Sequence, residues 1–287
     1  MAYQLPNGFE LGAIQLNVSD LERSLQFYQH TIGFSVLNRT GNSAALTVDG
    51  VHTFLVLHEP AEVQILPKQS TAGLYHFAIL LPDRKDLGRA LRHFIKEGIS
   101  HGSADHLVSE AIYLWDPDQN GIEIYVDRPS HTWSRTAGDE VEMTTMPMDT
   151  ASLITEAGEG VWGKLPPNSK LGHIHLHVTD LLAAADFYHK SLGFDITASD
   201  LTYAGVLFLA ANGYHHHIAI NTWAGKGASL PPKNAVGVSF YTMILPTEAE
   251  YEKLRHHLKK NGVPIRYEAG LLTVSDPTGA EIRIVVK

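Results

Sequence analysis

Apolar and polar residues alternate along several short stretches of the chain, and each stretch predicts a strand. In the clearest one, between His173 and Val178, histidines alternate strictly with isoleucine, leucine and valine. Further strands are predicted at Ala13 to Val18, His76 to Leu81, Val206 to Ala210, Ile218 to Trp223 and Phe240 to Leu245. Pro82 and Pro246 directly follow two of these runs, and proline suits a strand end because it cannot donate to the ladder.

A helix is predicted directly after the histidine-rich strand. Asp180 is a suitable N-cap, because its carboxylate can accept a hydrogen bond from a free N–H of the first turn. Between Leu181 and Leu192, apolar side chains recur at helical spacing on one face. Gly193 follows, and glycine commonly ends a helix.

This helix pattern occurs twice in the sequence. The pattern is found at 20–34 and again at 180–194. It consists of Asp-Leu, five residues, Phe-Tyr, four residues and Gly-Phe. A second pattern, which begins Leu-Arg-His and closes in glycine, is found at 91–98 and 254–262. The order A, B, A′, B′ indicates that a two-module unit was duplicated. Each module is predicted as a strand, a helix and then several strands.

The segment between the halves breaks this rhythm. Residues 128–170 are polar and contain four prolines, which predicts a connector with a short helix near Asp149 to Ala157. The predicted organisation is a pair of βαβββ modules at 1–127, the connector at 128–170, and a second pair at 171–287.

The composition sets limits on function. Hydrophobic residues make up 44% of the 287, enough to bury a sizeable core. A formal net charge of -9 argues against a nucleic-acid partner, because phosphate binding needs clustered Lys and Arg. The chain start lacks the features of a secretory signal, and no stretch approaches the roughly 18 apolar residues of a membrane span. We therefore expect a cytoplasmic protein without nucleic-acid or membrane partners; a homo-oligomer is compatible with the sequence.

Two residue counts bear on the chemistry. There is no cysteine, so disulfides, cysteine-bound metals and thiol nucleophiles are excluded. There are 17 histidines, and histidine is the commonest side-chain ligand of transition metals. Some, such as His256 and His257 on a charged helix, are expected at the surface. The others make a histidine-bound metal a candidate.

Four βαβββ modules in the order A, B, A′, B′ resemble the vicinal oxygen chelate superfamily of glyoxalases, bleomycin-resistance proteins and extradiol dioxygenases. Among these, the chain is most similar to the catechol 2,3-dioxygenases. The resemblance covers nearly the whole chain outside the connector. It implies an α+β fold in which modules pair into two cup-shaped mixed sheets, and in which a cup can hold one metal.

The resemblance also implies where ligands should lie. The first strand of a module can supply a histidine seven residues before the residue that opens the helix, and the last strand can supply a glutamate. His76 and His173 hold this position in modules two and three, and Glu123 lies in the last strand of module two. Modules one and four carry Ala13 and Phe240 instead. They are therefore predicted to be free of metal.

Two histidines and one carboxylate match the facial triad of non-heme Fe(II) enzymes, which leaves open positions for a diol and dioxygen. The predicted cofactor is Fe(II), with Mn(II) as the alternative because both accept N and O ligands. An inward-facing histidine can equally be a satisfied core residue, but the matched register in two modules favours ligands. In the best-known catechol 2,3-dioxygenases, modules three and four supply the triad. Here modules two and three must face each other.

Two further catalytic residues are implied by the resemblance. Tyr113 lies ten residues before Glu123, the family spacing, and would donate a hydrogen bond to a substrate oxygen. His106 resembles a family histidine upstream of this tyrosine, although the spacing here is two residues shorter. Without the family context, Tyr113 is equally well a core tyrosine with a solvated hydroxyl.

The run His215 to His217 resembles the strand that carries the family's acid/base histidine. By that register His216 has the role, and strand periodicity would place His215 and His217 on the opposite face. The alternative is an incidental surface tract. On the strand that begins at His173, His175 and His177 would either shape the pocket or be spare ligands.

The function implied is an extradiol dioxygenase that inserts O2 into a catechol-type aromatic diol at a mononuclear Fe(II). Its partners would be a small aromatic diol and O2, in a dry pocket for which Tyr113, Trp115, Phe77 and Trp223 are candidates. Two alternatives remain: a glyoxalase-like metal-dependent isomerase or lyase, and a non-catalytic protein that binds aromatic compounds. The sequence does not choose between catechol, a substituted catechol and a hydroquinone.

Overall fold

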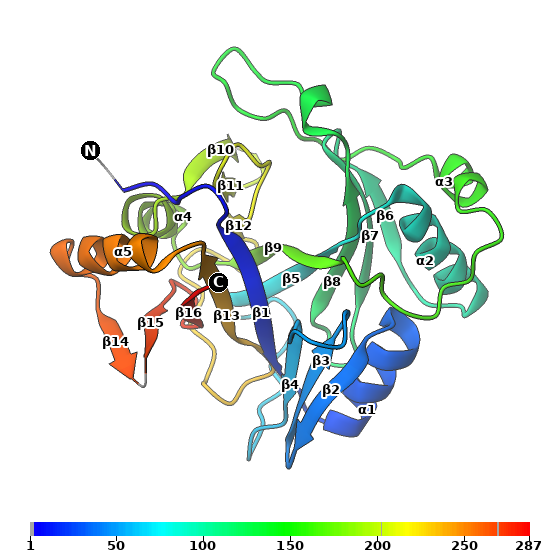
Figure 1. Ribbon diagram of the computed structural model, residues 1–287, viewed down its shortest axis with the longest axis horizontal. Helices are drawn as coiled ribbons and strands as arrows, with labels where there is room; N and C mark the ends of the chain where they lie inside the picture. The colour runs from blue at the N-terminus through cyan, green and yellow to red at the C-terminus, as the bar shows by residue number, and fades with distance from the viewer. Residues whose placement is uncertain (1–2, 202, 269) are drawn as a thin grey trace.

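Four βαβββ modules follow one another along the chain (Figure 1). The structure, a computed structural model, describes residues 3–201, 203–268 and 270–287. The first half contains β1 (Glu10–Asn17), α1 (Leu21–Gln26), η1 (Phe27–Ile32), β2 (Ser35–Thr40), β3 (Ser43–Thr47), β4 (Leu55–His58), β5 (Gly73–Leu80), α2 (Arg84–Lys96), β6 (Gly102–Asp105), β7 (Ser109–Trp115) and β8 (Gly121–Asp127). The connector contains η2 (Ser130–Thr132) and α3 (Thr150–Glu156). The second half contains β9 (Lys170–His177), α4 (Leu181–Asp186), η3 (Phe187–Ser191), β10 (Asp195–Asp200), β11 (Val206–Ala210), β12 (Ile218–Asn221), β13 (Gly237–Leu245), α5 (Glu248–Lys260), β14 (Ile265–Glu268), β15 (Leu271–Ser275) and β16 (Glu281–Val286).

These strands form two eight-stranded mixed sheets. The first has the order β14-β15-β16-β13-β1-β4-β3-β2 and joins modules one and four. The second has the order β10-β11-β12-β9-β5-β8-β7-β6 and joins modules two and three. At its centre β5 pairs antiparallel with β9, while β8 runs parallel to β5 and β12 parallel to β9. The expected α+β fold and the expected pairing of modules two and three are confirmed.

The two halves of the chain interlock, because each sheet takes strands from both sides of the connector. The halves predicted at 1–127 and 171–287 therefore describe sequence units, and their bounds stay a prediction. Residues 1–2 lie outside the described part of the chain. Among the helices of the described residues, none combines the length and the apolar character that crossing a membrane requires.

Alternation along β9 gives this strand two different faces. Ile174 and Leu176 are fully buried and belong to the main hydrophobic cluster, which also holds the buried residues of the helices. His173, His175 and His177 point to the other face, as the period of two requires. They are buried as well, so the histidine face is enclosed by protein.

The connector carries the helix predicted near 149–157. α3 follows Asp149, whose carboxylate accepts a hydrogen bond from the backbone N–H of Ser152 at 3.0 Å. The helix packs so closely on α2 that a Cβ at Gly88 would lie 2.4 Å from the Leu153 carbonyl oxygen. Only glycine permits this approach.

The repeated Phe-Tyr pattern forms a π-helical turn in both halves. The helix predicted over 181–192 is α-helical only in its first part and continues as η3, just as α1 continues as η1. Tyr28 and Tyr188 are buried there and donate hydrogen bonds to Asp116 at 2.9 Å and Asp276 at 3.1 Å. Each pattern thereby ties the first module of its half to the second, across the two sheets.

We expect Tyr28→Phe to lower the free energy of unfolding by about 1–3 kcal/mol, because buried Asp116 loses a donor. Burial raises the pKa of the Asp116 carboxyl to about 6, against the opposing hydrogen bonds of Asn120 and Tyr28. Because this pKa is raised in the fold, ionising Asp116 costs stability as pH rises from about 4 to about 6. Losing Tyr28 increases that cost. In urea unfolding, the difference in unfolding free energy between wild type and Tyr28→Phe should grow between about pH 4.5 and about pH 7.5. A difference that shrinks over this range would contradict the prediction.

Candidate metal centre

Three adjacent strands of the second sheet bring His76, Glu123 and His173 onto one face. Ala78 on β5 lies directly opposite Glu123 on β8 and His173 on β9, so these residues form a row across the sheet. His76 comes two residues before Ala78 and therefore shares its face. The small side chain of Ala78 leaves space above the middle strand.

The three side chains converge on that space. His76 Nε2 and His173 Nε2 each lie 3.0 Å from Glu123 Oε2, and the two nitrogens are 3.3 Å apart. Ligands about 2.1 Å from a metal would be about 3.0 Å apart at octahedral angles and about 3.4 Å apart at tetrahedral angles. The observed spacing fits three ligands with the remaining positions open. Within the described ranges, no other group of three histidines or carboxylates converges in this way.

The charges of the triad fit a metal. Burial alone would raise the pKa of Glu123, but His173 and His76 hold it well below its usual range. Burial lowers the pKa of His76, which keeps a ring lone pair available. A buried carboxylate is costly unless its charge is compensated, and a divalent cation among these atoms would compensate it. Two imidazoles and a carboxylate therefore form a site able to bind a metal.

Tyr113 and His106, both expected beside the triad, are hydrogen-bonded to each other. Tyr113 lies directly opposite Glu123 across β7 and β8. His106 donates its Nδ1–H to the Thr144 carbonyl at 2.6 Å, so a neutral His106 accepts the Tyr113 hydroxyl at Nε2, also at 2.6 Å. Burial and the charge of Glu123 raise the pKa of Tyr113 well above its usual range, so the phenol keeps its proton.

The strand geometry expected for residues 215–217 is wrong. β12 begins after them, and the three histidines lie in the turn that precedes it. His215 and His216 approach each other, with their Nδ1 atoms 2.7 Å apart, and do not point to opposite faces. His216 packs on His173 with ring centroids 4.1 Å apart, which places it beside the triad.

A tight turn causes this difference. Asn212 and Gly213 have φ angles of 59° and 73°, in the left-handed region, where the chain reverses between β11 and β12. His217 then packs against Phe9 and Phe194 in the core, with ring centroids 5.2 and 6.4 Å away. Its side chain is therefore directed away from the triad.

Asn221 fixes two further histidines of β9. Its Oδ1 accepts hydrogen bonds from the Trp223 backbone N–H at 2.9 Å and from His177 Nδ1 at 2.6 Å. Its Nδ2 donates to His175 Nε2 at 2.8 Å. The strand predicted to reach Trp223 ends at Asn221, and the Trp223 ring lies 5.3 Å from that of His175. Both histidines thus have a ring nitrogen committed to Asn221, and neither joins the triad.

Two of the aromatic residues predicted to line the pocket, Phe77 and Trp115, lie elsewhere. Phe77 points to the helix side of β5 and belongs to the hydrophobic core. Trp115 is 39% exposed and lines a separate cavity. Tyr125, not anticipated from the sequence, lies 4.9 Å from His173 between ring centroids. It follows Glu123 by two residues on the same strand, so strand periodicity could have identified it.

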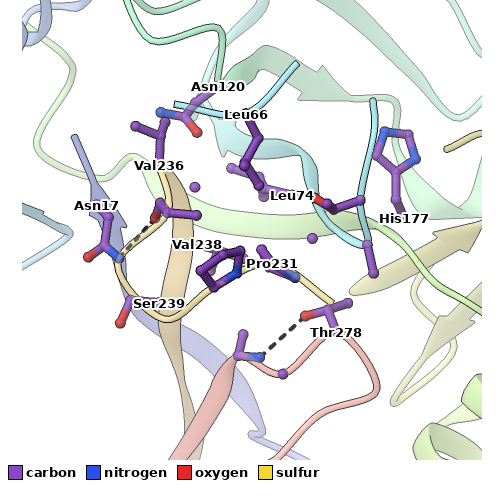
Figure 2. Close-up of a pocket in the computed structure, with 18 of the residues that line it drawn as sticks. Asn17, Leu66, Leu74, Asn120, His177, Pro231, Val236, Val238, Ser239 and Thr278 are labelled. Carbon is purple, nitrogen blue, oxygen red and sulfur yellow. Dashed lines mark hydrogen bonds between the residues drawn. The ribbon is translucent and has the colours of Figure 1, made fainter. Parts of the chain in front are cut away.

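Two cavities lie near the second sheet. The larger, of about 460 Å³, is lined in part by Thr144 and Phe208, and the Phe208 ring lies 5.0 Å from that of His216. The smaller, of about 330 Å³, has Asn17 and His177 on its walls (Figure 2). Both cavities reach the surroundings of the triad, because Tyr75 lines the smaller one and its ring lies 5.0 Å from that of His76.

In the first sheet, other residues hold the positions that correspond to the triad. There Thr242 pairs with Arg283, which takes the place that Glu123 has in the second sheet. Phe240, two residues earlier, takes the place of His76. The Arg283 guanidinium lies 3.5 Å from the centroid of the Phe240 ring. A cation–aromatic contact thus occupies the position that the triad has in the other sheet.

Comparison with known proteins identifies relatives along nearly the whole chain. The chain is 48% identical over 279 residues to Catechol-2,3-dioxygenase of Bacillus subtilis (strain 168), which covers 96% of this chain and 97% of that protein. A proposed dioxygenase from Bacillus subtilis subsp. subtilis str. 168 has a similar structure, with a TM-score of 0.65, 11% identity, and coverage of 96% of this chain and 84% of that one. Glyoxalase I from Zea mays follows, with a TM-score of 0.57, 15% identity, and coverage of 96% and 92%. At these low identities the two structures show the fold alone.

A family model matches both halves of the chain. It describes the Glyoxalase/Bleomycin resistance protein/Dioxygenase superfamily and matches residues 10–124 and 170–284. The matched segments leave out the connector and include His76, Glu123 and His173. The chain therefore belongs to the Glyoxalase/Bleomycin resistance protein/Dioxygenase superfamily.

Proposed function

We propose that this protein is an extradiol dioxygenase that cleaves a catechol-type aromatic diol with O2 at a mononuclear Fe(II). The observation that carries this proposal is the buried triad of His76, Glu123 and His173, whose spacing leaves metal positions open. The relative at 48% identity, named Catechol-2,3-dioxygenase, supports the same reaction. A homo-oligomer and a cytoplasmic location stay predictions from the sequence.

The triad would hold the iron through His76 Nε2, His173 Nε2 and Glu123 Oε2. Bound iron would supply adjacent open positions for the diol and dioxygen and a path for charge between them. Fe(II) is proposed over Mn(II) because it is the usual metal of an oxygenase facial triad. Only one carboxylate joins the two imidazoles, whereas a glyoxalase-like site usually has two. The donor set therefore favours the dioxygenase over the isomerase.

His216 is proposed as the base that takes a proton from the diol. Burial and the imidazoles of His173 and His215 hold the pKa of His216 well below its usual range, so it is neutral and can accept a proton. Within the described ranges, no residue hydrogen-bonds its Nε2. In this structure Tyr113 donates its hydroxyl proton to His106 Nε2, and it is proposed to turn that O–H to a substrate oxygen when the diol binds. His216, in the turn before β12, and Tyr113, on β7, would thus act together on the oxygens of the diol.

The proposal predicts that protein loaded anaerobically with Fe(II) will consume one molecule of O2 per catechol and give a yellow, ring-opened product. An oxygen electrode and absorbance spectra should be recorded together, with catechol, a substituted catechol and a hydroquinone as candidate substrates. Protein loaded with Mn(II) and metal-free protein are the controls. A colourless product formed without oxygen uptake would favour the isomerase. Binding of the diol without any product would favour an aromatic-binding protein.

A further inference from the structure

A chain of hydrogen bonds leads from Asp127 to the ring of His216. Asp127 ends β8, four residues after Glu123, so strand periodicity places both on the same face. Its Oδ1 lies 2.8 Å from His215 Nε2. The Nδ1 atoms of His215 and His216 are in turn 2.7 Å apart. His215 is fully buried, and Asp127 is 23% exposed at the outer end of the chain.

The carboxylate fixes the direction of these bonds. Asp127 can only accept, so His215 must carry a hydrogen on Nε2. A neutral His215 then has its lone pair on Nδ1 and accepts the Nδ1–H of His216. Neutral His216 consequently has its lone pair on Nε2, the nitrogen without a partner among the described residues.

We propose that Asp127, acting through His215, is a positioning residue that holds His216 in the tautomer able to take a proton from the diol. This inference rests on the proposed function of His216 as the base. In that step the diol O–H bond breaks, its electron pair stays on the oxygen, and a new N–H bond forms at His216 Nε2. The imidazolium so formed keeps its Nδ1–H bonded to His215, and the Asp127 carboxylate stabilises the positive charge through that ring.

Asp127 also makes a hydrogen bond that does not lead to His216, and this bond provides a control. Its carboxylate also accepts the hydroxyl of Tyr214, at 3.0 and 3.2 Å, and the Tyr214 hydroxyl lies 2.7 Å from that of Tyr125. Tyr214→Phe removes this second bond and leaves the link to His215 in place. It is therefore the matched control for changes at Asp127.

Asp127→Asn should keep its iron and a near-normal KM while kcat falls by roughly 10²–10⁴-fold, as expected when a general base is lost. An asparagine amide facing His215 can donate instead of accept, which reverses both tautomers and places a hydrogen on His216 Nε2. Asp127→Glu restores a carboxylate and should recover part of kcat. Tyr214→Phe should lose far less. Unchanged kcat in Asp127→Asn would overturn the proposal.

A second readout does not depend on turnover. The measurement is an NMR spectrum of metal-free protein with ¹⁵N-labelled histidine. The signals of His216 are those that disappear in His216→Gln. They should show a proton on Nδ1 and none on Nε2. Asp127→Asn should abolish this preference, and Tyr214→Phe should keep it. A wild-type His216 protonated at Nε2 would overturn the proposal. Absence of catechol turnover in the wild type would instead refute the proposed function, and the spectrum would still test the link from Asp127 to His216.

Discussion

Replacing His173 with alanine should remove most of the bound iron and lower catechol turnover by roughly 10³-fold, because a catalytic metal contributes several kcal/mol to transition-state stabilisation. His173 Nε2 lies 3.0 Å from Glu123 Oε2 and 3.3 Å from His76 Nε2, so the alanine variant lacks one of the three ligand atoms. Two remaining ligands would hold a divalent ion only weakly. Iron per chain, measured after anaerobic loading and gel filtration, is the appropriate measurement.

The matched control is His177→Ala, on the same strand and equally enclosed, but bonded to Asn221 and outside the triad. It should keep its iron, with circular dichroism confirming that both variants fold. If His173→Ala retained the full iron content and turnover, the proposed ligand set would be wrong.

His216→Phe should keep its iron but lose turnover by roughly 10²–10⁴-fold, the usual contribution of a general acid or base. The aromatic replacement keeps a ring against His173, where the ring centroids lie 4.1 Å apart, and lacks both ring nitrogens. Iron content and kcat should be measured on the same preparations. Iron lost together with turnover would make His216 a ligand.

His217→Phe is the control for this change. His217 lies next in sequence but packs against Phe9 and Phe194, so a phenyl ring keeps these contacts and loses only the acceptor of the Ala211 backbone N–H. The structure also changes the expectation for His215, whose side chain meets His216 and does not point to an opposite face. Turnover lost in His217→Phe but kept in His216→Phe would contradict the assignment of the base.

The triad could be predicted because its positions depend on register. His76 and His173 precede their helices by the same number of residues, and duplicated modules place such residues on equivalent strands. The family resemblance supplied the seven-residue spacing and the glutamate of the last strand, which Glu123 matches. The absence of histidine at Ala13 and Phe240 pointed to modules two and three as partners, which the antiparallel pairing of β5 with β9 bears out.

Other features could not be predicted, or were missed, for identifiable physical reasons. The resemblance to the family's catalytic strand suggested a strand through all three histidines, but the positive φ angles of Asn212 and Gly213 reverse the chain just before them. Contacts such as that of Asn221 with His175 join different strands, and no local spacing reveals them. Tyr125 and Asp127, by contrast, could have been predicted, because alternate residues of a strand share a face and both follow Glu123 at even spacing along β8.

Diffraction at the iron absorption edge, from crystals grown anaerobically with Fe(II) and catechol, tests the central claim most directly. The structure predicts a single iron peak about 2.0–2.3 Å from His76 Nε2, His173 Nε2 and Glu123 Oε2, with both catechol oxygens on the open side of the metal. Iron bound elsewhere, iron bound without Glu123, or catechol held away from the iron would contradict it.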